Sequence, residues 1–454
     1  MSSASRLAAR TPATRDRYVD FLRVFSLATV IVGHWLMAVF LVREDGGVSA
    51  GNALAIMPTL QPLTWLFQVM PLFFFVGGFS HAIALRRSGG PAEFIRSRAA
   101  RLLIPTAAFG AVWLALAAVI EVAGHDRGVL RLATRGVAQP LWFIGVYLGV
   151  VALAPVMMRL HRAYGLLVPV VLAAGVVAVD LTRFGLGVTE AGYLNLLLVW
   201  TAVHQFGFFY ADARLGRGAA CALAGGGLIA VVALTAFGPY PLSMVGMPGE
   251  RISNMSPPTL ALMAHASWLI GLALLLRGPL TRLLARPRIW VGVIAANGLA
   301  MTAFLWHLTA LFIACAVQLA LGLAQPPVGS VAWWILRPVW LGLLALVTAG
   351  LIALFRRADR PRPLVPRSVG AGRAAVGVTL CLLGVLGFSA VGFGGALAGR
   401  TADLLVLPIT PVRSALLLAA GALLLGLFEV RPVAAFRAGR GGPDRPATGR
   451  DDAP

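Results

Sequence analysis

One apolar stretch of 25 residues, 18–42, carries an arginine and a histidine eleven positions apart, Arg23 and His34. At about 100° per residue, eleven helical steps return to within about 20° of the starting direction. One face of a membrane helix therefore presents a guanidinium and, about 16 Å further along the axis, an imidazole. Asp20 lies on nearly the same face, one turn before Arg23. Ionisable side chains at this depth are costly, so they usually line a polar cavity and mark function.

The composition predicts an all-α protein that crosses a membrane many times. Of the 454 residues, 59% are hydrophobic and 12% are charged, and the mean hydropathy is +0.85. The net charge of +21 comes from arginine alone, since the chain has no lysine. Short arginine clusters alternate with apolar runs of about 20 residues, the length that crosses a bilayer. This pattern argues against a nucleic-acid partner and indicates a polytopic helical bundle embedded in membrane lipid.

Twelve helices are expected, about ten forming the core and two forming a C-terminal pair. The ninth is long, and we expect it to be either tilted or broken near Gly298. The predicted ranges are 19–42, 62–85, 102–124, 140–158, 165–181, 191–211, 219–239, 257–277, 290–321, 330–355, 374–396 and 411–430.

Arginine in the loops predicts the orientation. With the N-terminus in the cytoplasm, the inner segments hold 28 arginines and the outer loops hold 7, counted along the sequence. This excess places both termini in the cytoplasm. The first span lacks a convincing cleavage site, and we interpret it as a retained helix rather than a signal peptide.

Five segments follow from these patterns. They are a cytoplasmic N-terminal segment (1–18), a transmembrane domain (19–355), a cytoplasmic Pro/Arg linker (356–373), a C-terminal helix pair (374–430) and a disordered cytoplasmic tail (431–454). The sequence leaves the role of the helix pair open, and we expect the pair to be dispensable for chemistry. Its small residues, such as Gly394 and Gly395, could also support a homo-oligomer.

Five short motifs occur in an order that resembles one family. Asp20-x-x-Arg23 followed by ten residues and His34 resembles the first helix of the membrane acyltransferase-3 family. MPLFFFVGGFS (70–80) is similar to its second helix, with Gly77 where serine is common. Three later segments also resemble the family: FIRSRAARLLIP (94–105), PLWFIGVYL (140–148) and NGLAMTAFLWHL (297–308). The resemblance covers about residues 15–355.

The resemblance implies an integral membrane acyltransferase of the cell membrane. Such an enzyme moves an acyl group, usually acetyl from acetyl-CoA, to a hydroxyl or amine of a carbohydrate or lipid-linked acceptor. The donor is cytoplasmic, whereas many acceptors face outward. The resemblance does not decide whether the acyl group is acetyl or longer, and it does not identify the acceptor.

The polar face of the first helix is the candidate catalytic site. His34 could deprotonate the acceptor or carry the acyl group itself, and we favour the general base. Arg23 could stabilise the oxyanion or a phosphate, and Asp20 could orient Arg23. The alternative is an ion pair at the membrane boundary and a histidine used for packing.

Arg98 and Arg101 are the candidate phosphate clamp for acyl-CoA, because guanidinium pairs bind phosphate oxygens bidentately. The alternative is plain anchoring by positive charge. Arg96 lies off the family pattern and is expected in solvent. His307, Trp142 and Asn297 are candidate cavity residues, although His307 could equally be a packing residue and Trp142 an interfacial anchor.

Other polar residues of the spans have weaker assignments. His81, His204 and His265 could line the cavity or bond a neighbouring helix. Glu121 and Asp180 end predicted spans and are expected to be solvated at the outer interface. None of the histidines has metal-binding spacing, so no metal is expected.

Two other classes of protein compete with the enzyme. Twelve helices with buried charges also fit a secondary transporter or exporter, but no internal repeat is present. A non-catalytic scaffold does not explain the charges of the first span.

Overall fold

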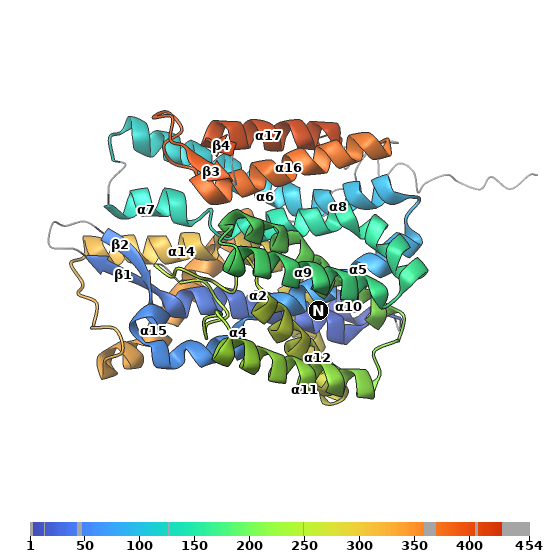
Figure 1. The fold of residues 1–454 in the computed structure, drawn as a ribbon. Coiled ribbons are helices and arrows are strands. Elements are labelled where there is room, and N and C mark those ends of the chain that lie inside the picture. Colours follow the sequence, from blue (N-terminus) through green and yellow to red (C-terminus); the bar gives the residue numbers. More distant parts are fainter. Residues whose placement is uncertain are drawn as a thin grey trace, which may run out of the picture.

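The fold is a bundle of long, roughly parallel helices (Figure 1). The structure, a computed structural model, describes residues 3–12, 14–42, 48–125, 128–247, 249–357, 369–404 and 407–428. In these residues, eleven helical segments are long and apolar enough to cross a membrane. Their main helices are α2 (Arg17–Met37), α5 (Met70–Arg87), α6 (Pro91–Val122), α8 (Leu141–Tyr164), α9 (Leu167–Gly185), α10 (Asn195–Ala211), α11 (Arg217–Phe237), α12 (Leu260–Leu284), α14 (Ala300–Ala320), α15 (Val331–Phe355) and α16 (Ala371–Val391).

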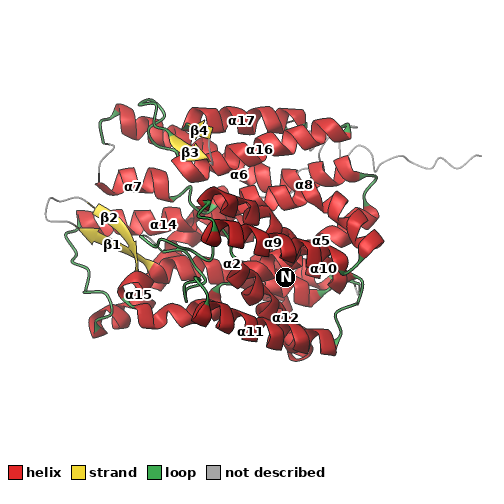
Figure 2. Cartoon of the chain, viewed as in Figure 1, coloured by secondary structure: helices red, strands yellow, loops and turns green. Residues whose placement is uncertain are grey.

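Short elements connect the long helices. Two small antiparallel hairpins are the strands of the described chain, and both lie toward the left end of the bundle in Figure 2. The hairpins are β1 (Ala38–Val42) with β2 (Val48–Asn52) and β3 (Ala402–Leu404) with β4 (Leu407–Ile409). The short helices are α1 (Ser3–Ala9), α3 (Ala53–Ile56), η1 (Pro58–Leu63), α4 (Thr64–Phe67), α7 (Gly128–Gly136), η2 (Thr189–Leu194), α13 (Pro287–Asn297) and α17 (Pro411–Leu424).

The predicted helical membrane bundle is confirmed, with ten long segments in the core and one in the C-terminal pair. The predicted break in the ninth span is also confirmed, because α13 ends at Asn297 and α14 begins at Ala300. The twelfth helix is shorter than predicted. The 14 residues of α17 rise only about 21 Å, less than the roughly 30 Å of a hydrocarbon core.

Glycines let three core helices approach closely. A Cβ atom at Gly78 of α5 would clash with the backbone oxygen of His204 on α10, and one at Gly207 of α10 would clash with the backbone of α5. A Cβ atom at Gly77 would lie 2.6 Å from the hydroxyl oxygen of Tyr147 on α8. Gly77 and Gly78 therefore allow α5 to pack closely against α8 and α10.

The C-terminal pair packs against the core. Leu386 and Leu382 of α16 fill the space beside Gly145 and Gly149 of α8. Arg96 of α6 is buried, and its Nε and Nη2 donate to the carbonyl oxygens of Leu425 and Gly426, just after α17, at 2.9 and 3.1 Å. The expectation that Arg96 is solvated is wrong, because a guanidinium can satisfy the free carbonyls at a helix C-terminus.

Two acidic residues are also less exposed than predicted. Asp180 is buried and accepts hydrogen bonds from Asn195 Nδ2, Tyr240 Oη and the Leu260 backbone N–H at 2.8–2.9 Å. Glu121 is half-buried and accepts from backbone N–H groups just after α16, at 3.1 Å from Ala396. These donors replace water, which allows the carboxylates to leave solvent.

Candidate functional site

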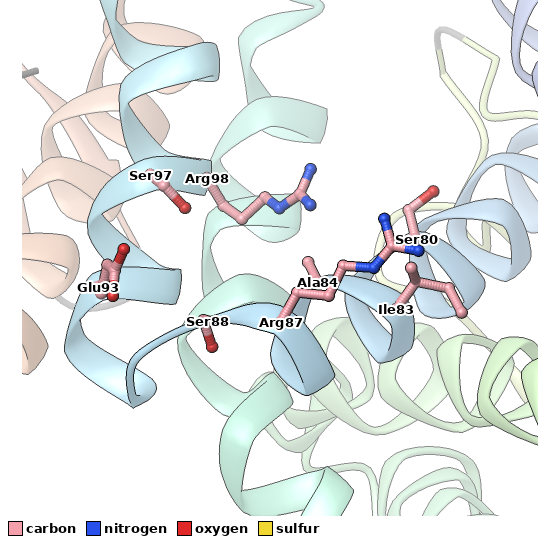
Figure 3. A pocket seen from close by; sticks show the side chains of 8 residues that line it. All are labelled: Ser80, Ile83, Ala84, Arg87, Ser88, Glu93, Ser97 and Arg98. Carbon is pink, nitrogen blue, oxygen red and sulfur yellow. The ribbon is translucent and has the colours of Figure 1, made fainter. Parts of the chain in front are cut away.

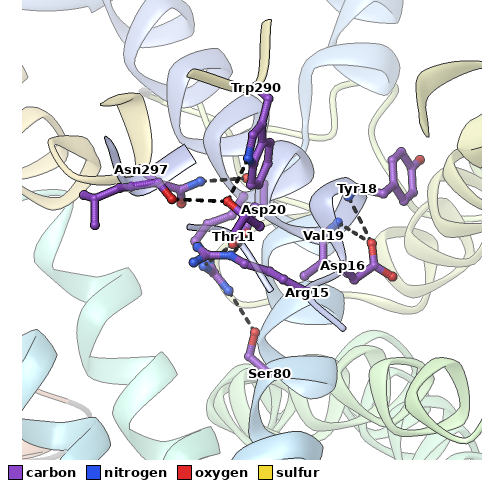
Figure 4. Close-up of polar contacts among 11 residues, drawn as sticks. Thr11, Arg15, Asp16, Tyr18, Val19, Asp20, Ser80, Trp290 and Asn297 are labelled. Atoms are coloured by element: carbon purple, nitrogen blue, oxygen red, sulfur yellow. Dashed lines mark hydrogen bonds and ion pairs between the residues drawn. The ribbon is translucent and has the colours of Figure 1, made fainter. Parts of the chain in front are cut away.

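The polar face of α2 begins with an acid shared by two arginines. Asp20 Oδ2 lies 2.6 Å from Arg15 Nε, and Asp20 Oδ1 lies 3.3 Å from Arg23 Nη1 (Figure 4). Asn297, at the end of α13, donates from Nδ2 to the backbone oxygen of Asp20 at 3.2 Å. The structure thus brings Asp20, Arg23 and Asn297 together, at the point where the broken ninth span meets α2.

Arg23 connects this acid to a second helix. Its Nη2 donates to Ser80 Oγ of α5 at 2.8 Å. One end of the guanidinium therefore meets a carboxylate and the other meets a hydroxyl. Two anchors hold the planar group in one orientation, which a single contact would leave free to rotate.

Ser80 also lines a pocket between α5 and α6. The pocket has a volume of about 270 Å³. Its lining contains two guanidinium groups and three hydroxyls (Figure 3); the residues are Ser80, Ile83, Ala84, Arg87, Ser88, Glu93, Ser97 and Arg98. Donors of this kind suit phosphate oxygens, whereas Glu93 adds one repelling carboxylate.

The three arginines at the start of α6 have different positions. Arg98 is half-buried and lines the pocket, Arg101 is exposed and lies outside the lining, and Arg96 bonds the C-terminal pair. Arg87 at the end of α5 lines the pocket instead of Arg101. The tandem Arg86–Arg87 offered the only sequence signal for Arg87, and the same signal is typical of plain membrane anchoring.

The imidazole of α2 pairs with a histidine 273 positions later. His34 Nδ1 lies 2.9 Å from His307 Nε2, and the two rings stack with centroids 5.0 Å apart. His307 is fully buried, whereas His34 is half-buried. The indole of Trp35 donates to the backbone oxygen of His307 at 3.1 Å, which fixes α14 against α2 at this level.

The hydrogen-bond network assigns the protons of this pair. His307 Nδ1 lies 2.6 Å from the backbone oxygen of Phe304, which can only accept, so Nδ1 carries the proton. The Nε2 of a neutral His307 is then an acceptor, and His34 must donate to it from Nδ1. The lone pair of His34 is consequently on Nε2, which has no hydrogen-bonding partner among the described residues.

Trp142 packs among other aromatic rings. Its ring is 6.5 Å from Trp200 and 6.2 Å from Phe143, measured between centroids. The neighbouring Phe143 instead reaches Phe304, at 5.4 Å, whose carbonyl holds His307. The assignment of Trp142 to the cavity stays a prediction, and Phe143 is the aromatic residue that the sequence did not single out.

A comparison with protein families assigns the chain. The family model described as an acyltransferase domain matches residues 16–357. The chain belongs to the membrane acyltransferase-3 family. The match covers the residues described above from Asp20 to His307, leaves out Arg15, and ends just after α15. No curated protein and no solved structure matches the chain.

Membership makes this multi-pass membrane protein an acyltransferase and supports that class over the transporter and the scaffold. Among the described residues, no three histidine, cysteine or acidic side chains are arranged to hold a metal ion.

Sequence patterns missed a second histidine pair. His81 Nδ1 of α5 lies 2.9 Å from His204 Nε2 of α10, and Tyr147 Oη of α8 lies 3.3 Å from His81 Nε2. Each residue was visible as a polar group in an apolar span, but no spacing linked the three helices.

Proposed function

We propose that this membrane acyltransferase moves an acyl group, most simply acetyl, from cytoplasmic acyl-CoA to a hydroxyl or amine of a carbohydrate or lipid-linked acceptor. The observation that carries the proposal is the unpartnered Nε2 of His34, on the helix face whose Arg23 reaches the pocket edge. A half-buried imidazole with an available lone pair is suited to accept a proton from a hydroxyl or an amine.

The arginine pocket is the proposed donor site. Arg87, Arg98 and the three serines supply donors that fit the phosphates of CoA, and the excess of arginine in the predicted inner segments places this end in the cytoplasm. A volume of about 270 Å³ lies near the lower end of typical ligand pockets, so it fits part of the donor rather than all of it. Arg101 lies outside this lining.

In the proposed reaction, residues of α2 have separate roles, and His307 of α14 supports one of them. His34 Nε2 takes the proton of the acceptor, while His307 keeps the ring oriented and accepts from Nδ1. Arg23 stabilises negative charge that develops on the thioester oxygen, and Asp20 holds Arg23 in place. A general base explains the geometry without a covalent acyl-histidine.

We propose the same organisation as the sequence predicted, with both termini in the cytoplasm of the cell membrane. Residues 19–355 form the acyltransferase unit, 1–18 and the linker 356–373 flank it, and 374–430 form the helix pair. The segment 431–454, predicted to be disordered, and most of the linker lie outside the described residues. Self-association is also left as a proposal.

Radiolabelled acetyl-CoA tests the proposal. Membranes containing the protein are mixed with a cell-envelope fraction that supplies the acceptor, and both free CoA thiol and label in the envelope are measured. We expect both to rise together and to require His34. Label that stays on CoA in the presence of the wild-type protein would refute the proposed donor.

A further inference from the structure

The His81–His204 pair is buried beside the proposed donor pocket. His81 follows Ser80, which lines the pocket and binds Arg23. The Phe94 ring lies between His81, with centroids 5.3 Å apart, and Arg98, whose guanidinium carbon is 6.0 Å from the ring centre. The pair therefore lies beside the pocket lining, next to Ser80 and to the Phe94 ring that reaches Arg98.

The protons of this second pair can be assigned from one unpaired atom. His204 Nδ1 is buried and has no partner. Buried N–H groups without an acceptor are rarer than buried acceptors without a donor, so we place the His204 proton on Nε2. His204 then donates to His81 Nδ1, and His81 donates from Nε2 to Tyr147 Oη.

This direction leaves the hydroxyl proton of Tyr147 available. The oxygen already accepts from His81, and no other hydrogen bond engages it in the described chain. The glycine at position 77 gives the hydroxyl its space, because a Cβ atom there would lie only 2.6 Å from it. The three helices together present one phenolic proton, held at His81 beside the pocket lining.

We propose that Tyr147 protonates the sulfur that leaves the acyl donor, and that His81 and His204 position it. This inference rests on the proposed donor. As the carbon–sulfur bond breaks, its electron pair stays on sulfur, and the Tyr147 O–H proton moves to that sulfur to give CoA thiol. The N–H of His81 stabilises the phenolate, which regains a proton from water after CoA leaves. The hydroxide formed from that water takes up the proton that His34 removed from the acceptor, so both residues return to their starting states.

The test changes the leaving atom and keeps the rest of the donor. Acetyl-CoA is compared with its oxygen analogue, in which oxygen replaces the thioester sulfur, using label transfer to the envelope fraction. An alkoxide is a far stronger base than a thiolate, so its departure depends more on a proton donor. We expect Tyr147→Phe to lose about tenfold with the thioester and about a hundredfold or more with the oxygen analogue, within the usual range of acid catalysis.

Three variants separate this role from a loss of structure. His34→Ala should lose activity equally with both donors, because His34 acts on the acceptor. Gly77→Ala, whose Cβ atom would displace the Tyr147 hydroxyl, should reproduce the donor-selective loss of Tyr147→Phe. His265→Gln is the matched control, since His265 is buried and, among the described residues, its hydrogen-bonding partner is the Trp65 backbone oxygen.

Two results would overturn the assignment. In one, Tyr147→Phe lowers the transfer rate equally with acetyl-CoA and with the oxygen analogue, or does not lower it at all. Tyr147 would then have only a structural role. The other is a wild-type protein that uses acetyl-CoA but cannot use the oxygen analogue. Failure of the wild-type protein to use acetyl-CoA would instead refute the proposed donor itself.

Discussion

The two histidine pairs share one distance and differ in the direction of their hydrogen bonds. Nδ1 of the first ring lies 2.9 Å from Nε2 of the second in both His34–His307 and His81–His204. In the first pair, His307 donates from Nδ1 to the Phe304 carbonyl oxygen, and His34 donates from Nδ1 to His307 Nε2. The lone pair on His34 Nε2 is therefore available. In the second, the unpaired His204 atom reverses the direction, and the chain ends on the hydroxyl proton of Tyr147.

This contrast fits the needs of a group transfer. An acceptor hydroxyl must lose a proton, and a leaving sulfur gains one. A histidine pair can help either to remove a proton or to donate one. The group that fixes the proton on one ring decides whether the other end of the hydrogen-bonded chain offers a lone pair or a proton. The comparison shows that buried histidines with the same local geometry can have opposite proposed roles.

The largest expected effect tests the first pair directly. His34→Ala should reduce transfer from acetyl-CoA by about 10²–10⁴, the usual contribution of a general base. The variant should stay folded, with its CoA affinity unchanged by calorimetry. Turnover near the wild-type level would eliminate His34 as the base, and with it the distinction between the two pairs.

A smaller effect is expected at the partner of His34. His307→Gln removes the ring that fixes the His34 proton and should lower kcat by about ten- to a hundredfold, as expected for a displaced catalytic group. The KM for acetyl-CoA should not change, because His307 lies outside the pocket lining. A rise in KM without a fall in kcat would place His307 in donor binding instead.

Arg98 and Arg101 sharpen the comparison on the donor side. Arg98 lines the pocket and Arg101 does not, so Arg98→Ala should raise the KM for acetyl-CoA by about tenfold, the value of one charged hydrogen bond. Arg101→Ala serves as the matched control and should change KM less. Equal effects in steady-state kinetics would support the pair of clamps that the sequence predicted.

The smallest effect concerns the C-terminal pair, which supports α8 on either side of Tyr147 through Leu386 and Leu382. Ending the chain after Arg360 should lower transfer from acetyl-CoA by about fivefold, equivalent to about 1 kcal/mol. The rate of transfer from the oxygen analogue should fall more than the rate from acetyl-CoA. Equal rates for full-length and truncated protein, with normal insertion, would show that the pair is dispensable, as the sequence suggested.

The sequence determined the features that depend on neighbours along one helix. The apolar runs predicted ten core spans, the eleven-residue spacing placed Arg23 and His34 on one face, and Gly298 marked the break between α13 and α14. These features follow from helix periodicity and bilayer thickness, which act locally. The family motifs added the enzyme class, which the family match confirms.

Only the tertiary structure decided which groups on different helices meet. His34 and His307 are 273 positions apart, and His81 and His204 are 123 apart, so no spacing could pair them. Solvation of Arg96 and Asp180 was predicted wrongly for the same reason, because their partners come from distant segments. Helix periodicity sets the direction of a side chain, whereas close packing of separate helices sets what it touches.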